Sequence, residues 1–428
     1  MKLLKTLSLS VIGLLGTGAM AQEFSSDIQI RPRYEYTNGF GTLLTPATSH
    51  TSFVGNRSRL NLNYKDEKLA VKLSLQNVRT WGAVNHLTGN LSNSANNSFV
   101  LFEGWAQYSL TDKWSTKVGR QIISYDNQRI FGGLDWANQG RSFDAALIKF
   151  KGAKSQLDLG VALNAANENK TVANPLTTVT FGTDLDFKSF QYAWYHTSIK
   201  KLGVSFLALN IGKEYLKTPT EVETNYYQTL GTYANYAGKK LSLDFSFYGQ
   251  TGKSGAKQVS AYESAINLGY AFTPKFKATL GYEYLSGIDQ SKISTTQVVK
   301  SFNPVFGTNH AFNGYMDYFY VGNHSGTVGL QDLTLKLDFP IKKVNLSVAP
   351  HIFHTANELT ATSDKYLGTE VDLTAVYKAS KDITLTAGYS QMFATNTMVA
   401  LKGGLDDTTN NWAYLMVNIN PQIFSAKK

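Results

Sequence analysis

The chain has 428 residues, of which 43% are hydrophobic, 13% aromatic and only 17% charged. It contains no cysteine, which excludes disulfides, a thiolate nucleophile and any metal site built on cysteine. The chain has 41 lysine and arginine residues against 31 aspartate and glutamate residues, a net charge of +10. Where the basic residues lie in the sequence decides whether they indicate an acidic binding partner.

The first 21 residues have the pattern of a secretory signal peptide. Lys2 and Lys5 form a basic start, residues 7–15 form an apolar run, and Ala19-Met20-Ala21 is a cleavage site of small residues. The apolar run is shorter than the ~20 residues that cross a bilayer as a helix. We therefore predict an exported protein whose residues 22–428 form a single mature domain.

Apolar and polar side chains alternate through most of the mature chain. In residues 241–248 and again in residues 332–339, leucine and phenylalanine fill every second position. Successive side chains of a strand point to opposite faces, so this period predicts a sheet with one apolar face. The pattern predicts eighteen strands, near residues 27–36, 51–64, 68–81, 98–110, 114–125, 140–150, 155–166, 184–198, 202–214, 224–236, 241–251, 260–272, 275–286, 327–339, 342–354, 366–378, 381–393 and 410–420.

The predicted connections alternate strictly between eight short turns and nine longer segments rich in glycine, asparagine, serine and threonine. A soluble sandwich has no reason to sort its loops by length, whereas a transmembrane barrel has short periplasmic turns and long extracellular loops. The sequence therefore predicts an all-β fold, a transmembrane antiparallel β-barrel of about eighteen strands. We expect it in the outer membrane of a Gram-negative bacterium, in contact with lipid and lipopolysaccharide, with both termini in the periplasm.

The two basic residue types are distributed differently. Many lysines lie in or beside the short turns, where they form a solvated rim that needs no nucleic acid or other acidic partner. All eight arginines lie between residues 31 and 141. The strand phase places four of them inside the barrel: Arg31, Arg33, Arg57 and Arg59.

Three further arginines, Arg120, Arg129 and Arg141, flank the third long connection, residues 126–139. One interpretation is a cationic track that guides anionic solutes, because a guanidinium holds carboxylate or phosphate with two hydrogen bonds. The other interpretation is that the arginines pair with acidic residues and only stiffen the wall. The acidic candidates are Glu35, Glu103, Asp126, Asp135 and Asp144.

The stretches 117–121, 125–132 and 136–145 read KVGRQ, YDNQRIFG and WANQGRSFDA. This series resembles the alginate-export porin family, whose members are eighteen-stranded outer-membrane barrels. Residues 302–310 and 314–318 look like Bacteroidetes-type versions of that family. The resemblance implies a pore-wall role for the motif residues and an acidic oligosaccharide or organic anion as solute. The predicted pore-lining or constriction residues are thus Arg31, Arg33, Arg57, Arg59, Glu103, Arg120, Asp126, Arg129, Asp135, Arg141 and Asp144.

Two features depart from the family pattern. The chain ends four residues after Phe424, although many outer-membrane barrels end on an aromatic residue, and its last 287 residues contain no arginine. The longest connection, residues 287–326, holds seven aromatic side chains. We expect it to be either a plug in the pore or a carbohydrate-binding lid.

No arrangement of residues predicts an enzyme or a cofactor. In Asn323-His324-Ser325-Gly326 the histidine and serine are adjacent, so on a strand they point to opposite faces. His351 and His354 likewise fall on opposite faces, which argues against a metal pair. The acidic residues 358, 364, 406 and 407 lie in predicted outer loops, where they either bind calcium or are simply solvated. We predict a porin for small hydrophilic, anionic solutes; the alternatives are a scaffold barrel with a loop-closed lumen and, less favoured, an outer-membrane hydrolase.

Overall fold

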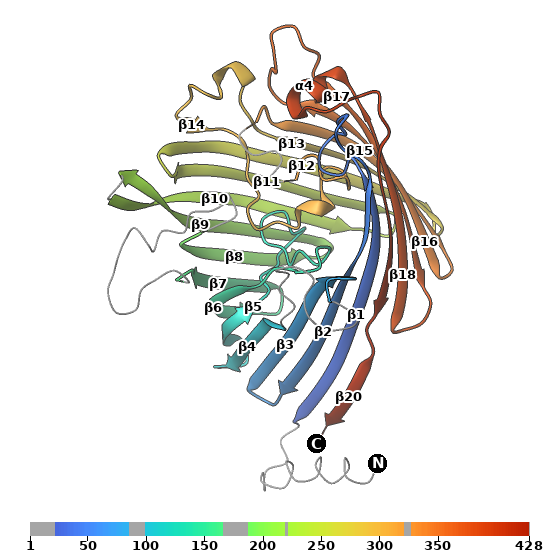
Figure 1. Ribbon diagram of the computed structural model, residues 1–428. Coiled ribbons are helices and arrows are strands. Elements are labelled where there is room, and N and C mark those ends of the chain that lie inside the picture. Colours follow the sequence, from blue (N-terminus) through green and yellow to red (C-terminus); the bar gives the residue numbers. More distant parts are fainter. Residues whose placement is uncertain (1–21, 85–98, 166–186, 219–220, 321–326, 428) are drawn as a thin grey trace.

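The computed structural model describes residues 22–84, 99–165, 187–218, 221–320 and 327–427 (Figure 1). In these residues the chain forms one sheet that curves around and closes on itself. None of the described helices is long and apolar enough to cross a membrane. The predicted signal peptide, residues 1–21, lies outside the described residues and stays a prediction.

Eighteen strands form the wall, and each pairs antiparallel with the next along the chain. They are β1 (Glu23–Asn38), β2 (Thr51–Lys65), β3 (Leu69–Thr80), β4 (Val100–Ser109), β5 (Trp114–Gln121), β6 (Phe143–Lys151), β7 (Ser155–Leu163), β8 (Ser189–Ile199), β9 (Leu202–Thr218), β10 (Glu221–Ala237), β11 (Leu241–Ser254), β12 (Lys257–Thr273), β13 (Phe276–Leu285), β15 (Leu330–Ile341), β16 (Val344–Thr355), β17 (Tyr366–Lys378), β18 (Ile383–Ala394) and β19 (Asn410–Ile419). β19 pairs with β1, with Leu415 opposite Tyr34, and this pairing closes the barrel. The predicted fold class is confirmed.

Two short strands lie outside this count. β14 (Val298–Val299) belongs to a long loop and pairs with β12, while β20 (Gln422–Lys427) continues β19 beyond Pro421. Proline has no N–H to donate, so the hydrogen-bond ladder is interrupted there before β20 pairs with the start of β1. The even number of wall strands places residue 22 and the chain end at the same rim.

The connections differ from the prediction at two places. β9 and β10 pair as far as Thr218 and Glu221, and β11 and β12 pair as far as Ser254 and Lys257. The fifth and sixth extracellular connections are therefore tight hairpins, not long loops. Paired strands satisfy each other's backbone groups, so their ladder continues past the apolar band that the sequence period marks.

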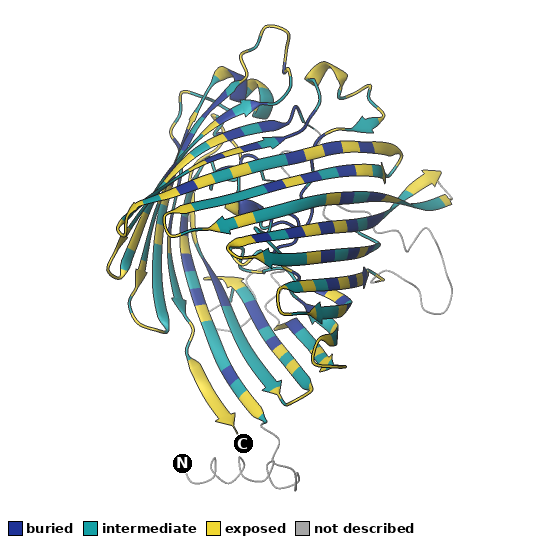
Figure 2. Cartoon of the chain, turned by 180° about the vertical axis from the view of Figure 1, so that it is seen from behind, coloured by how far each residue is buried: buried dark blue, intermediate teal, exposed yellow. Residues whose placement is uncertain are grey.

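Apolar side chains cover the outside of the wall. On β15, Leu333 and Leu335 are 40% and 41% exposed, whereas Asp332 on the other face is 4% exposed. Figure 2 shows the same alternation of buried and exposed residues along neighbouring strands. A wall with this polarity suits a lipid exterior and a polar interior, because lipid offers no hydrogen-bond partner.

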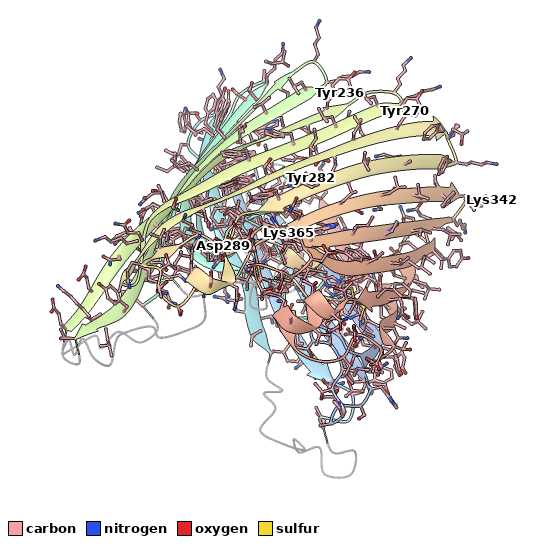
Figure 3. The ribbon with its side chains drawn as sticks, turned by 90° about the horizontal axis from the view of Figure 1, so that it is seen from above. Tyr236, Tyr270, Tyr282, Asp289, Lys342 and Lys365 are labelled. Carbon is pink, nitrogen blue, oxygen red and sulfur yellow. The ribbon has the colours of Figure 1, made fainter. Side chains whose placement is uncertain are left out.

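Aromatic rings gather near one end of the outer wall. Phe276 stacks on Phe272 and on Phe339, with ring centroids 5.3 and 5.2 Å apart. These rings lie beside the turn at Lys275, and Figure 3 shows Tyr270 toward the same end as Lys342. Aromatic rings are favoured at the membrane–water interface, so this cluster marks the periplasmic boundary of the lipid-facing band.

The buried core lies inside the barrel, where two long loops pack against the wall. We call residues 122–142 the third loop and residues 286–329 the seventh loop; residues 321–326 of the latter are not described. Phe131 of the third loop and Phe306 of the seventh stack with centroids 5.5 Å apart, and both pack on Phe143 and Phe190 of the wall. The two loops narrow the lumen between them (Figure 1).

Candidate functional site

Arginines on β1 and β2 hold the tip of the third loop. Arg31 Nη1 donates to the Asp135 carbonyl at 2.6 Å, and Arg33 Nη1 donates to the Trp136 carbonyl at 2.7 Å. Arg57 Nη2 lies 2.8 Å from the Asp135 carboxylate. These three arginines are at most 6% exposed, and a buried guanidinium needs partners for its N–H groups. The loop backbone supplies them.

Asp135 is the acidic partner of this basic wall. Partial loss of water around its carboxyl inside the barrel would by itself raise the pKa of Asp135, although the side chain is 77% exposed, but the guanidinium groups of Arg57 and Arg31 outweigh that effect and hold the pKa below its usual value. The carboxylate is therefore ionised at neutral pH. It neutralises part of the charge that the arginines bring into the lumen.

Carboxylates on β17, which is separated from β1 by β18 and β19, hold the seventh loop. Glu370 accepts a hydrogen bond from the Met316 backbone N–H at 2.8 Å, and Asp372 accepts one from the Tyr315 N–H at 3.2 Å. Gly314 directly precedes these two residues with φ +82°, and a Cβ there would stand 2.7 Å from the Glu370 carboxylate. Only glycine both adopts this φ readily and leaves room for the carboxylate.

Two more carboxylates extend this acidic wall to β13 and β15. Asn313 donates to Glu283 Oε2 at 2.5 Å and to Asp332 Oδ2 at 3.3 Å. His351 lies with Nδ1 2.9 Å from Asp332 and Nε2 3.6 Å from Asp372. The basic wall thus binds one loop through its carbonyls, and the acidic wall binds the other through its amides.

Direct contacts join the two loops across the lumen. Trp136 stacks on His310 with centroids 4.5 Å apart, and the Arg33 guanidinium lies 4.1 Å from the other face of the Trp136 ring. Arg129 of the third loop pairs with Glu283 at 2.8 Å and donates to Asn313 Oδ1 at 3.1 Å. These contacts make one rigid constriction from loops that are far apart in sequence.

Two small cavities flank Ala311 in this constriction. One of about 170 Å³ is polar, with Asn127, Asn267, Glu283, Asp332 and His351 in its lining. The other, of about 200 Å³, is mainly aromatic, with Trp136, His310, Tyr315 and Tyr414 in its lining. The constriction therefore presents both charged and ring surfaces to a passing solute.

Four other predicted site residues contact their neighbours along the lumen. Arg59 donates to Gln76 Oε1 at 2.5 Å and stacks over Phe102 at 3.8 Å. Glu103 accepts from Trp105 Nε1 at 3.0 Å and pairs with Lys72. Asp126 accepts from Trp194 Nε1 at 3.0 Å, and burial raises the pKa of this loop carboxyl. Arg141 Nη1 donates to the Gly307 carbonyl at 2.9 Å.

The structure places Arg120 and Asp144 elsewhere than predicted. They pair with each other at 2.8 Å on the same face as Val118 and Ile148, which are 54% and 49% exposed on the outer wall. Lys117 and Gln121, at the alternate positions, face inward. The family motif drew attention to Arg120, whereas the strand phase of β5 turns it away from the lumen.

Sequence analysis missed several charged residues that face the lumen. Lys72, Lys117 and Lys149 occupy inward positions on β3, β5 and β6; Lys72 pairs with Glu103, and Lys149 with Asp158. Each of these lysines is next in sequence to an outward-facing apolar residue, Leu73, Val118 or Ile148, and this alternation predicts that the lysine faces inward. The acidic wall was missed because each strand contributes only one or two carboxylates, and only the register brings them together.

Two of the described histidines, both inside the barrel, are held by carboxylates. His310 and His351 bond to the carboxylates of Asp317 and Asp332, and residue 324 lies outside the described part of the chain. Within the described residues, no group of three or more histidine, aspartate or glutamate side chains can hold a metal ion.

Comparison with known proteins places the chain among outer-membrane barrels. The profile of the family described as Alginate export matches residues 21–404. Comparison with curated proteins returns no match. Among solved structures, Acinetobacter baumannii OccAB4 is similar with a TM-score of 0.62 and 12% identity, covering 94% of this chain and 98% of that chain. Pseudomonas aeruginosa OccK11 (OpdR) has a TM-score of 0.59 and 13% identity over 94% and 96% of the chains. Pseudomonas aeruginosa OccK2 (OpdF), solved in complex with glucuronate, has 0.57 and 11% over 94% and 98%.

Proposed function

Because the chain belongs to the Alginate export family and is an outer-membrane channel protein rather than an enzyme, we propose that it passes small hydrophilic solutes that carry a carboxylate. Movement is by passive or facilitated diffusion, and no chemical step is involved. The solute class is an acidic sugar or another organic anion of similar size. The channel spans the outer membrane with residue 22 and residue 427 on the periplasmic side.

The observation that carries this proposal is the excess of cations over carboxylates on the lumen side of β1 to β6, where Glu35 and Glu103 pair with only some of the cations. The cations lie on β1 to β6, and the carboxylates that hold the seventh loop lie on β13 to β17. Arg31, Arg33 and Arg57 are occupied by the third loop, but Arg59 and Lys117 are only partly buried. A carboxylate that follows the basic side meets partly exposed cations in a narrow space, where water screens charge weakly.

The structural neighbours are consistent with this solute class. OccK2 was solved with glucuronate, a sugar carboxylate, in a barrel of the same fold. The aromatic cavity beside Trp136 and Tyr414 gives such a solute an apolar surface next to the cation of Arg33. A sugar acid has both a carboxylate and apolar C–H faces, so it matches both surfaces.

A scaffold barrel with a closed lumen is the second candidate. The observation that favours it is the direct packing of the third loop on the seventh, through Phe131, Phe306 and Trp136 on His310. A barrel closed in this way passes no ions. Ion conductance therefore separates the two candidates before any solute is tested.

Reversal potentials across a potassium chloride gradient test the anion preference. The wild-type channel should favour chloride over potassium, and Lys117→Gln should reduce that preference because it removes a lumen-facing cation. Lys240→Gln, in an exposed periplasmic turn, is the matched control and should leave the potential unchanged. Preference of the wild-type channel for potassium would refute the anionic solute class while leaving the channel itself intact.

A further inference from the structure

The strands of the barrel wall are shortest at β5, β6 and β7, which are neighbours in the sheet. These strands have 8, 9 and 9 residues, against 17 each for β9 and β10. At their extracellular ends lies a cavity of about 510 Å³, here called the rim pocket. Its lining residues are Arg120, Arg141, Ser142, Phe143, Asp144, Leu163, Asn164, Ala165, Phe187, Val305 and Phe306. It is separate from the two cavities in the constriction.

The floor of the rim pocket is apolar. Phe143 and Phe306 are 6% and 2% exposed, and their ring centroids lie 5.1 Å apart. Phe187 adds a third ring 5.6 Å from Phe306, and Val305 is buried beside it. This floor is held in place by the packed loops, so an apolar group that enters the pocket displaces water without rearranging the protein.

The edge of the rim pocket is charged and carries a net positive charge. Arg120 Nη1 pairs with Asp144 Oδ2 at 2.8 Å, and Arg141 Nη1 donates to the Gly307 carbonyl at 2.9 Å. The edge therefore carries two guanidinium groups and one carboxylate. A guanidinium has five N–H donors, and among the described residues these contacts use one donor of each arginine. The remaining donors suit a carboxylate or phosphate oxygen.

We propose that the rim pocket binds an amphipathic anion, with its carboxylate or phosphate at Arg120 and Arg141 and its apolar part over Phe143 and Phe306. Arg120, Arg141 and Asp144 belong to one sequence motif. A role in the pore does not account for Arg120 and Asp144, because they face outward. Arg120 and Leu163 lie on the outer face of the wall, where Leu163 is 62% exposed. Among the described residues, the pocket therefore opens toward the outer leaflet at Arg120 and Leu163.

Such an anion has two sources: the phosphate and acyl chains of an outer-leaflet lipid, or a soluble amphipathic carboxylate. Titration calorimetry on the folded full-length barrel in detergent tests the soluble source with hexanoate. Acetate has the same head without the chain, and hexanol has the same chain without the charge. Native mass spectrometry with lipid A tests the lipid source. Both measurements are independent of conductance, so they stand even where the proposed channel function fails.

Variants that are expected to change the binding affinity in opposite directions make the test specific. Arg120→Gln and Arg141→Gln should each weaken binding of the successful probe about tenfold, as expected for a charge-assisted hydrogen bond. Asp144→Asn should tighten binding, because it removes the competing carboxylate, and a misfolded protein does not bind more tightly. Lys154→Gln, in a periplasmic turn, is the control for net charge.

Either probe suffices to support the proposal, and the one that binds identifies the source. Hexanoate or lipid A should bind saturably, while acetate and hexanol should bind at least about tenfold more weakly. Absence of saturable binding for both probes would overturn the proposal. So would binding that responds to Lys154→Gln as strongly as to Arg120→Gln, or that weakens in Asp144→Asn.

Discussion

At the scale of single residues, most arginines in the lumen bind protein groups before any solute arrives. Arg31, Arg33 and Arg57 donate to carbonyls and a carboxylate of the third loop. These contacts agree with the interpretation in which the arginines pair with acidic residues and stiffen the wall. The cationic track stays a proposal.

Arg129 makes the most consequential of these pairs. It is 2% exposed and lies between Glu283 and Asn313. Arg129→Gln should loosen the third loop, because losing one partner of a buried pair costs about 3–5 kcal/mol. Hydrogen exchange of third-loop amides measures this. Arg120→Gln removes an exposed pair worth about 0–1 kcal/mol and is the control. Equal exchange in the two variants would contradict the anchoring role.

Asp135 makes the stability of the docked third loop depend on pH. Its pKa is held below the ordinary 3.8 by Arg57 and Arg31, so ionised Asp135 stabilises the docked loop above that pH. As the pH falls through the lowered pKa, the carboxyl takes up a proton and this stabilisation is lost. Current noise recorded between pH 5 and pH 3 should rise at the acid end. In Asp135→Asn the noise should be high throughout, and a pH response like that of the wild type would rule out Asp135 as its source.

At the scale of strands, the sequence period identified all eighteen wall strands in order, because lipid on one side and polar groups on the other impose it. Leu333 and Leu335 lie outward and Asp332 inward as that period requires. The same reasoning assigns Lys117 inward and Arg120 outward, although motif similarity pointed the other way. Strand phase is thus the better guide to which charged residues line the lumen.

The contacts between loops could not be read from the sequence. Glu283 lies on the polar face of β13, and Glu370 and Asp372 lie on the polar face of β17. Nothing local in the sequence marks these carboxylates as partners of residues 313–316. Gly314 combines a positive φ with a close approach of the Glu370 carboxylate, and only the folded barrel brings that carboxylate beside it. Such pairings depend on the barrel register, which joins residues that are tens of positions apart.

The free-energy cost of a charged side chain in the barrel wall depends on its depth in the membrane and on whether it faces lipid or the lumen. Leu335 lies near the middle of β15, on the outer face and opposite Leu280. Leu335→Arg should destabilise the folded barrel by about 2–4 kcal/mol, since it places a charge in lipid. Thr386→Arg, on the lumen face of β18, should cost much less. Urea unfolding in lipid vesicles compares them, and equal costs would contradict the assignment of faces.

At the scale of the whole molecule, a wide barrel is narrowed by two loops fixed to walls of opposite charge. A barrel of this strand number leaves an aqueous path when nothing fills it. Replacing residues 301–320 by a short Gly-Ser linker should therefore raise the single-channel conductance severalfold. The folded state of this variant is checked by its heat-dependent migration in gel electrophoresis. A folded variant with wild-type conductance would show that the seventh loop does not limit the path.

The most direct test of the central claim is a recording of the purified, folded wild-type protein in a planar bilayer. The account predicts discrete single-channel steps, because charged and polar side chains of the wall line the lumen around the two anchored loops. A folded barrel that inserts into the bilayer and gives no steps at any voltage or salt concentration would contradict it.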